Sequence, residues 1–187
     1  RSWKWNLPDH FYRFVADHVT FVSVDTNMIM LGLEWVRDQR GWMREQLAAV
    51  ETPWVVAFGH HPWRSNGGHG NAGNYDGLGR LDITGLVSGR RLAEFFAEEL
   101  CAGVDLYLSG HDHNRQVLEA PDGCRTELVV SGAGSKLDGL ERRDGNPTRF
   151  EEDGHEGFFW FEITDRALTM EAWRKDGTRD FRRTLQR

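Results

Sequence analysis

The chain has 187 residues, 39% of them hydrophobic and 12% aromatic, enough apolar surface for one domain, or a large part of one, with its own core. This composition excludes intrinsic disorder. The net charge of -6 argues against nucleic-acid binding, which usually needs a basic face, and no apolar stretch reaches the ~18 residues that cross a bilayer.

Up to about residue 110, apolar residues form short strand-like runs that alternate with helix-like spacing. A stretch rich in Gly, Asn and Asp interrupts this pattern, and a loop of that length usually carries function. In chain order we predict a strand at 19–24, a helix with apolar positions from Leu33 to Val50, a strand at 54–58, a loop at about 64–85, a helix at 92–100 and a strand at 104–108.

Beyond residue 114 the helical spacing stops and strand patterns follow one another, separated by turn signals such as Pro-Asp-Gly. The segment 138–156 is a charged excursion of the kind that is often mobile. The order of elements predicts an α/β layered sandwich with mixed sheets and helices outside. The predicted strands are 115–119, 126–131, 157–163, 167–174 and 179–185.

Histidines follow two of the predicted strands directly. His60 comes after the strand at 54–58, in Gly59-His60-His61-Pro62, and His111 and His113 come after the strand at 104–108. Functional groups in an α/β sheet gather at the carboxyl ends of its strands, and neutral imidazole binds Zn, Fe and Mn. The pattern therefore predicts a metal site formed by His60, His111 and His113.

The spacing of His111 and His113 allows one motif to serve two ions, because residues two apart on an extended backbone point in opposite directions. His61 is better interpreted as a surface residue or a satisfied core histidine. A ligating imidazole usually holds its second ring nitrogen against an acceptor. Ser109, Asp112 and Asn114 are the candidates for this supporting role.

With these motifs the chain resembles the calcineurin-like metallophosphoesterases, and among them the purple or tartrate-resistant acid phosphatases. The match to the family's Val-x-x-His motif is loose, because Ala57 stands where Val is common. The matching segments, in order, are Val24-Asp25-Thr26-Asn27, Gln46-Leu47-Ala48-Ala49, Gly59-His60-His61-Pro62, Ser65 with His69-Gly70, Val104 to Asn114, Val130-Ser131-Gly132-Ala133-Gly134 and Gly157-Phe158.

The resemblance implies an α/β/β/α metallophosphoesterase sandwich with two metal ions, whether Fe, Zn or Mn. It implies that His60 and His111 bind one ion and His113 the other. It also implies that His69, nine residues after His60, approaches the substrate phosphate or the leaving group. Its catalytic role is a hypothesis, since His69 could instead only order its Gly-rich loop.

The family's other motifs, of the types Asp-x-His, Gly-Asp-x-x-Asp/Tyr and Gly-Asn-His-Asp/Glu, do not occur in these 187 residues. The resemblance implies that they lie before Arg1 and supply the bridging carboxylate and the remaining ligands. We therefore expect residues 1–187 to be the C-terminal part of one domain, missing its N-terminal half and inactive alone. Its active-site loops would be about 59–70 and 109–114, and its β-rich end 115–187.

The implied function is metal-dependent hydrolysis of phosphate monoesters as part of a longer polypeptide. A phosphodiesterase of the same superfamily would share the histidines and would be distinguished by its activity on diesters. A non-catalytic module that retains the fold is the alternative from another class.

The two cysteines of the chain, Cys101 and Cys124, follow a predicted helix and precede a predicted strand. They either form a disulfide or remain two buried thiols. A disulfide would indicate an oxidising compartment and a secreted or periplasmic protein. Four aromatic residues are candidates for the mouth of the site, although tryptophan more often anchors a core: Trp3, Trp5, Trp63 and Tyr75.

Overall fold

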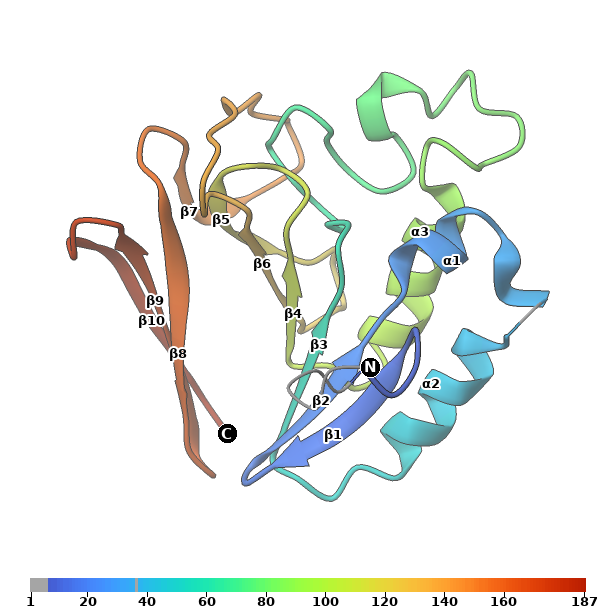
Figure 1. Ribbon diagram of the computed structural model, residues 1–187, viewed down its shortest axis with the longest axis horizontal. Coiled ribbons are helices and arrows are strands. Elements are labelled where there is room, and N and C mark those ends of the chain that lie inside the picture. The colour runs from blue at the N-terminus through green and yellow to red at the C-terminus, as the bar shows by residue number, and fades with distance from the viewer. Residues whose placement is uncertain (1–6, 36) are drawn as a thin grey trace.

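The computed structural model describes residues 7–35 and 37–187 (Figure 1). No helix in these residues is long and apolar enough to span a bilayer. The elements are β1 (Tyr12–Ala16), β2 (Val19–Ser23), α1 (Thr26–Met30), η1 (Leu33–Trp35), α2 (Gln39–Ala48), β3 (Trp54–Phe58), η2 (Tyr75–Gly77), α3 (Arg90–Phe95), η3 (Phe96–Leu100), β4 (Leu106–Ser109), β5 (Arg115–Glu119), β6 (Glu127–Ser131), β7 (Thr148–Glu152), β8 (Gly157–Ile163), β9 (Ala167–Arg174) and β10 (Arg179–Gln186).

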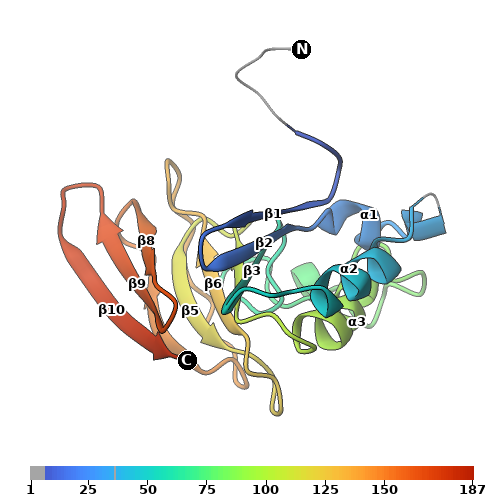
Figure 2. The same ribbon diagram turned by 90° about the horizontal axis from the view of Figure 1, so that it is seen from below.

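Two sheets form the centre of the structure. The larger has seven strands in the order β1-β2-β3-β4-β6-β5-β7, and the smaller has three in the order β10-β9-β8. Strands β2, β3, β4 and β6 run parallel, whereas the flanking pairs and the small sheet are antiparallel. The helices cover one face of the large sheet and the small sheet lies against the other (Figures 1 and 2). This confirms the predicted mixed α/β fold.

The described residues account for three of the four layers of the expected sandwich. A second helical layer, outside β8–β10, is not present in residues 7–35 and 37–187.

Strand β3 is buried along nearly its whole length, because it has a layer on each face. Val55 and Ala57 pack on the helix side with Phe96, whereas Trp54 and Val56 pack on the small-sheet side. An unbroken apolar run, Trp54-Val55-Val56-Ala57-Phe58, is the pattern expected of a central parallel strand. The sheet is thereby held from both faces, and its strand ends are rigid supports for the loops.

The predicted helix from Leu33 to Val50 is shorter in the structure. It begins only at Gln39, because the Asp38 carboxylate accepts a hydrogen bond from the backbone N–H of Gly41 at 2.8 Å and caps a new helix there. Before it lie the short helix α1, capped by Asp25, and the 3₁₀ turn η1. Val36, part of the predicted periodic pattern, lies outside the described residues.

Two strands were not anticipated. Strand β1 pairs with β2 through a tight turn in which Asp17 has a φ of 45°. Strand β7 lies within the segment 138–156, so the expectation of a mobile excursion is wrong for this part. Phe150 packs into the core between the two sheets and explains why β7 is ordered.

Cys101 and Cys124 form a disulfide with a Cα–Cα distance of 5.0 Å, so the first of the two alternatives for the cysteines is the one found. The bond joins the end of η3 to the turn that leads into β6. It lies at the start of β4 and β6, at the opposite edge of the sheet from the histidine turns.

Candidate active site

His60 and His111 are brought together by the parallel pairing of β3 and β4. Phe58 pairs with Leu108 at the end of the ladder. The pairing continues into the two turns, because the N–H of Gly59 donates to the Leu108 carbonyl at 3.0 Å and that of Gly110 donates to the His60 carbonyl at 3.1 Å. The sheet itself therefore sets the separation of the two histidines.

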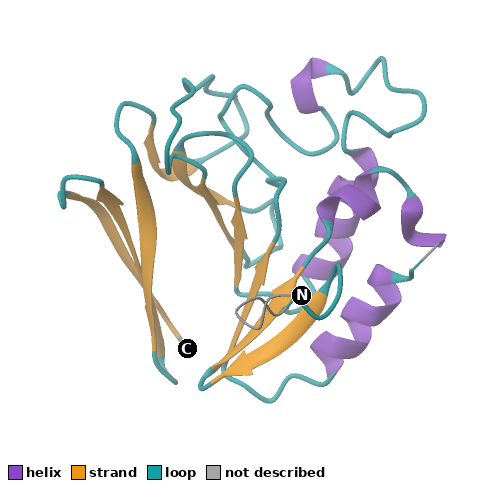
Figure 3. Cartoon of the chain, in the orientation of Figure 1, coloured by secondary structure: helices purple, strands orange, loops and turns teal. Residues whose placement is uncertain are grey.

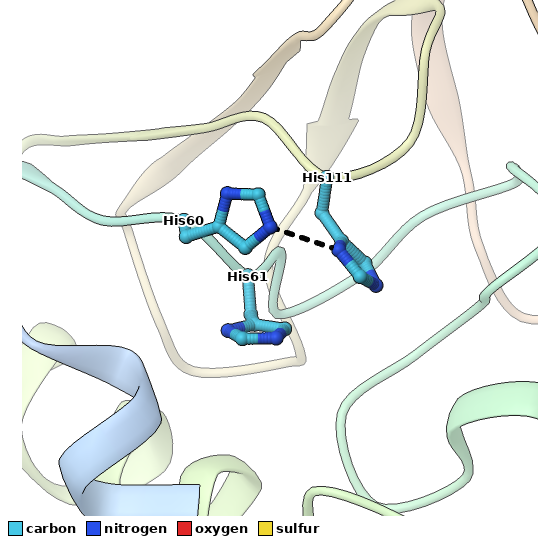
Figure 4. A group of neighbouring side chains, drawn as sticks. All are labelled: His60, His61 and His111. Carbon is cyan, nitrogen blue, oxygen red and sulfur yellow. Dashed lines mark hydrogen bonds between the residues drawn. The ribbon is translucent and has the colours of Figure 1, made fainter.

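Three imidazoles converge at this edge (Figure 4). His60, His61 and His111 each present a ring nitrogen, and these atoms lie within 4.8 Å of one another. The shortest separation joins His111 Nδ1 to His60 Nε2 at 3.0 Å. Donors around a single ion with metal–nitrogen distances of about 2.0–2.1 Å lie about 3–4 Å apart, so only a small contraction would be needed to ligate a metal.

His61 belongs to this cluster, although the sequence favoured a surface or core role for it. The residue is buried, as expected of a core histidine, and its Nδ1 lies 2.8 Å from the Thr26 hydroxyl. This contact leaves Nε2 available to the cluster. The missed signal is Thr26, in the Asp25-Thr26-Asn27 segment that follows β2 and brings a hydroxyl beside the turn after β3.

Burial, followed by the neighbouring imidazoles, lowers the pKa of His61 to about 4. Burial also lowers the pKa of His111 to about 4, with His69 and His60 adding to the effect. Both rings are therefore neutral at neutral pH, the form in which imidazole offers a lone pair to a metal.

The backbone of His111 adopts the left-handed conformation, with a φ of 65°. Strain of this kind in a non-glycine residue persists only where the surrounding structure enforces it, and it is concentrated at functional sites. The turn is also tightly packed: a Cβ added to Gly132 would lie 2.0 Å from the Asp112 carbonyl oxygen. We therefore expect Gly132→Ala to displace this turn.

His113 lies apart from the three-histidine cluster. Its Nδ1 contacts the Asp138 carboxylate, which also accepts a hydrogen bond from Lys136 Nζ at 3.0 Å. The contact with His113, followed by that with Lys136, lowers the pKa of Asp138. This is the arrangement in which a carboxylate orients an imidazole while the other ring nitrogen stays available for ligation. Asp138 was not anticipated, because it lies 25 residues from His113.

His69 lies beside the cluster, with its ring centroid 4.3 Å from that of His111. Its backbone N–H donates to Asp112 Oδ1 at 3.1 Å, and its Nδ1 lies 2.8 Å from Asp76 Oδ1. The structure thus brings the predicted catalytic histidine to the predicted metal ligands.

The three residues expected to support the ligands have other partners. Asp112 holds the His69 backbone, Ser109 donates to the Val129 carbonyl at 3.2 Å, and Asn114 Oδ1 accepts from Gln116 at 2.6 Å. Asp112 Oδ2 and Asn114 Nδ2 are buried without a hydrogen-bond partner. Among the described residues, these three organise the loops around the histidines, and their side chains make no hydrogen bond to the imidazoles.

Of the aromatic candidates for the mouth, Trp63 and Tyr75 are buried. Trp63 packs on Phe96 in the core, and Tyr75 lies beneath the cluster with its hydroxyl donating to the Pro62 carbonyl. They anchor the site and do not line its mouth. Trp3 and Trp5 lie outside the described residues.

The family model of the calcineurin-like phosphoesterases matches residues 9–115, more than half of the chain and all of the histidine turns. The chain belongs to this family. It is 30% identical over 213 residues to human tartrate-resistant acid phosphatase type 5, a match that takes in 100% of the chain and 60% of the human protein. The chain therefore spans less than two thirds of the length of this homologous acid phosphatase.

Solved structures of lower sequence identity share the fold. A purple acid phosphatase from yellow lupin seeds superposes with a TM-score of 0.68 at 19% identity, over 95% of this chain and 32% of the lupin chain. A Plasmodium protein described as "GAP50 the anchor in the inner membrane complex" superposes with a TM-score of 0.70 at 19% identity, over 98% of this chain and 56% of the other. At these identities the likeness concerns the fold.

The donor set fits the metal ions that the family implies. Neutral imidazoles are ligands for Zn, Fe and Mn, and three of them converge here with two held in place by the sheet and one by Thr26. A metal cofactor is thus consistent with both the family and the residues present.

Proposed function

We propose that this chain provides part of the active site of a metal-dependent phosphatase that hydrolyses phosphate monoesters at a dinuclear centre. The observation that carries the proposal is the convergence of His60, His61 and His111 beside His69. Structural histidines do not need to meet at the ends of two parallel strands. Because relatives are longer than this chain, the proposal applies to the natively expressed protein with any residues that flank it.

In this proposal His60 and His111, with His61 beside them, hold one ion. His113, oriented by Asp138, ligates the second through Nε2. A pair of metal ions supplies charge neutralisation for the phosphoryl oxygens and a hydroxide nucleophile near neutral pH. Metal analysis of the native protein would identify the ions as Fe, Zn or Mn.

The chain's own residues have two further roles. The packed turns hold the imidazoles in position before substrate arrives, which lowers the reorganisation needed during reaction. His69 lies beside His111, with the ring centroids 4.3 Å apart, and donates a proton to the leaving oxygen as the ester bond breaks. The Cys101–Cys124 disulfide supports a location outside the cytosol, in a secreted or periplasmic protein.

The first test is phosphate release from an aryl phosphate monoester by the native protein, before and after chelation and with Fe, Zn or Mn restored. We expect metal-dependent turnover that His111→Ala abolishes, and much weaker turnover of a bis(aryl) phosphate. Faster cleavage of the diester would instead identify a phosphodiesterase.

A folded protein with no turnover of either ester would favour a non-catalytic role. The similarity to a Plasmodium protein described as an anchor shows why this outcome needs a direct test. Circular dichroism of the His111→Ala variant is the control for folding. Lost activity with an unchanged spectrum assigns the loss to the site.

A further inference from the structure

The segment after His69 folds back on the histidine. Asp76, in the turn η2, places its Oδ1 2.8 Å from His69 Nδ1, and its backbone N–H donates to the His69 carbonyl oxygen at 2.9 Å. The same residue thus contacts His69 through both its side chain and its main chain. In the described contacts, no residue hydrogen-bonds His69 Nε2, so the second ring nitrogen is available on the side of the ring away from Asp76.

The main chain holds the Asp76 carboxylate in this position. Asp76 has a φ of 53° and a ψ of 23°, a left-handed conformation that a non-glycine residue seldom adopts. The preceding residue, Tyr75, is buried and its hydroxyl donates to the Pro62 carbonyl, next to the histidine turn after β3. One anchored turn therefore joins the His69 loop to the metal-binding edge of the sheet.

We propose that Asp76 is a positioning residue that holds His69 in one orientation for proton donation, an inference that rests on the proposed phosphatase function. The carboxylate accepts a hydrogen bond from Nδ1–H, so the proton on Nε2 is the one directed at substrate. The donating form of His69 is the imidazolium, which carries a proton on each ring nitrogen. As a water oxygen forms the new bond to phosphorus and loses one proton to solvent, the old ester bond breaks and the leaving oxygen takes the Nε2 proton. His69 is then neutral and keeps its proton on Nδ1, held by Asp76.

The pair itself contributes little to the stability of the fold. The side chains of His69 and Asp76 are 43% and 55% exposed, and an exposed pair of this kind contributes less than about 1 kcal/mol to stability. The contact therefore adds little to stability, and its main effect is to fix the orientation of the His69 ring.

Asp76→Gly is the most informative substitution, because glycine removes the carboxylate and accepts the left-handed backbone without strain. Asp17→Gly is the matched control: Asp17 is also exposed, has a φ of 45°, and lies in the turn between β1 and β2. Asp76→Asn is the conservative variant, since the amide oxygen can still accept from Nδ1–H and asparagine tolerates the same conformation.

Kinetics of the native protein measure the effect on proton donation. With Asp76→Gly we expect kcat on alkyl phosphates, which have poor leaving groups, to fall about 10- to 100-fold, part of the contribution of a general acid. On activated aryl phosphates we expect kcat to change less than about two-fold, because their leaving oxygens need no proton. KM should stay constant on both, Asp76→Asn should recover part of the loss, and Asp17→Gly should behave as the wild type.

A second measurement does not depend on turnover. Nitrogen-15 shifts of the His69 ring, assigned with His69→Gln, should show the neutral ring protonated at Nδ1 in the wild type and in Asp17→Gly. In Asp76→Gly this preference should be lost.

The outcomes separate this inference from the proposed function. A wild type that hydrolyses monoesters, with Asp76→Gly equal to wild type on alkyl phosphates or equally slow on both ester classes, overturns the positioning role alone. A neutral His69 protonated at Nε2 in the wild type overturns it as well. A folded wild type that hydrolyses no phosphate ester overturns the proposed function, and the role of Asp76 in catalysis with it.

Discussion

The histidine turns after β3 and β4 and the loop over residues 64–89 both line the candidate site, but they are held by different forces. The two turns extend the hydrogen-bonded ladder of a buried parallel sheet. The loop leaves the sheet and has almost no regular structure (Figure 3). Polar side chains hold it: Asn146, buried, donates through Nδ2 to the Ser65 carbonyl at 3.1 Å and to Asn71 Oδ1 at 2.7 Å.

In the proposed function, this difference separates metal binding by the turns from proton donation by the loop. The proposed ligands His60 and His111 depend on the fold of the sheet, which only global unfolding removes. His69 depends on local hydrogen bonds that can open without disturbing the sheet. Changes in the loop should therefore lower turnover while metal affinity remains, and changes in the turns should remove both.

The largest expected effect comes from His60→Ala. With one of three converging imidazoles lost, we expect metal affinity to fall by more than about 100-fold, beyond the 10- to 100-fold typical of residues that only support a ligand. Metal content after dialysis against a competing chelator measures it. His155→Ala, a change of an exposed histidine outside the cluster, is the control. Unchanged metal content in His60→Ala would show that His60 is not a ligand, and would contradict the assignment of metal binding to the turns.

Removal of the disulfide should destabilise the framework and spare the site. For the double change Cys101→Ser and Cys124→Ser we expect the free energy of unfolding to fall by about 3 kcal/mol, because the unfolded chain regains the entropy of a closed loop. Urea denaturation measures this, with the reduced wild type as the matched comparison. Metal affinity of the folded variant should be unchanged, since the bond lies at the far edge of the sheet. A fall in affinity would show that the two edges are coupled.

Asn146→Ala tests whether the loop opens on its own. Loss of the side chain leaves the part-buried Asn71 Nδ2, which donates to Asn146 Oδ1 at 2.9 Å, without its acceptor, at a cost of about 1–3 kcal/mol. We expect amide hydrogen exchange to accelerate in residues 65–76 while β3 and β4 stay protected. Asn27→Ala, in an exposed position of α1, is the control. Acceleration across the whole sheet would mean that loop and turns unfold as one unit.

The smallest effect concerns pH and Asp82 in the same loop. Burial would raise the pKa of Asp82, but the backbone N–H groups of Ser88 and Val87 and the Thr84 hydroxyl outweigh it and hold the pKa well below its ordinary value. A carboxylate with a lowered pKa contributes stability above its unfolded pKa of about 3.9, and this contribution is lost as the pH falls. Proteolysis within residues 82–88 should therefore accelerate below about pH 4, and Asp82→Asn should be susceptible already at neutral pH. Equal cleavage of wild type and variant at pH 7 would contradict this.

Much of the fold could be predicted from local pattern. The apolar run Trp54–Phe58 and the strands of the β-rich end lie where periodicity indicated. The prediction was wrong where a single capping side chain, Asp38, divided an apparently continuous helical pattern. It also missed β7, whose charged sequence is explained by pairs such as Arg149 with Glu119 and by the burial of Phe150 between two sheets.

The residues of the site were likewise predictable only where the signal is local in the sequence. His60 and His111 were predictable because a strand end is a local feature and parallel strands align their ends. His61 was underestimated because its orientation depends on Thr26, 35 residues earlier. Asp138 and Asp76 gave no signal, because an aspartate in a turn is common and only its place in the fold brings it to a histidine.

The sequence by itself thus determined most of the elements, the family and the histidines at the strand ends, all of which depend on local periodicity and recognisable motifs. Only the tertiary structure decided which groups meet: His61 with His60 and His111, His113 with Asp138, and His69 with Asp76. The physical reason is that a hydrogen bond or a ligand cluster requires groups within a few ångströms of one another in space. The groups that form these contacts are separated along the chain, and only folding brings them together.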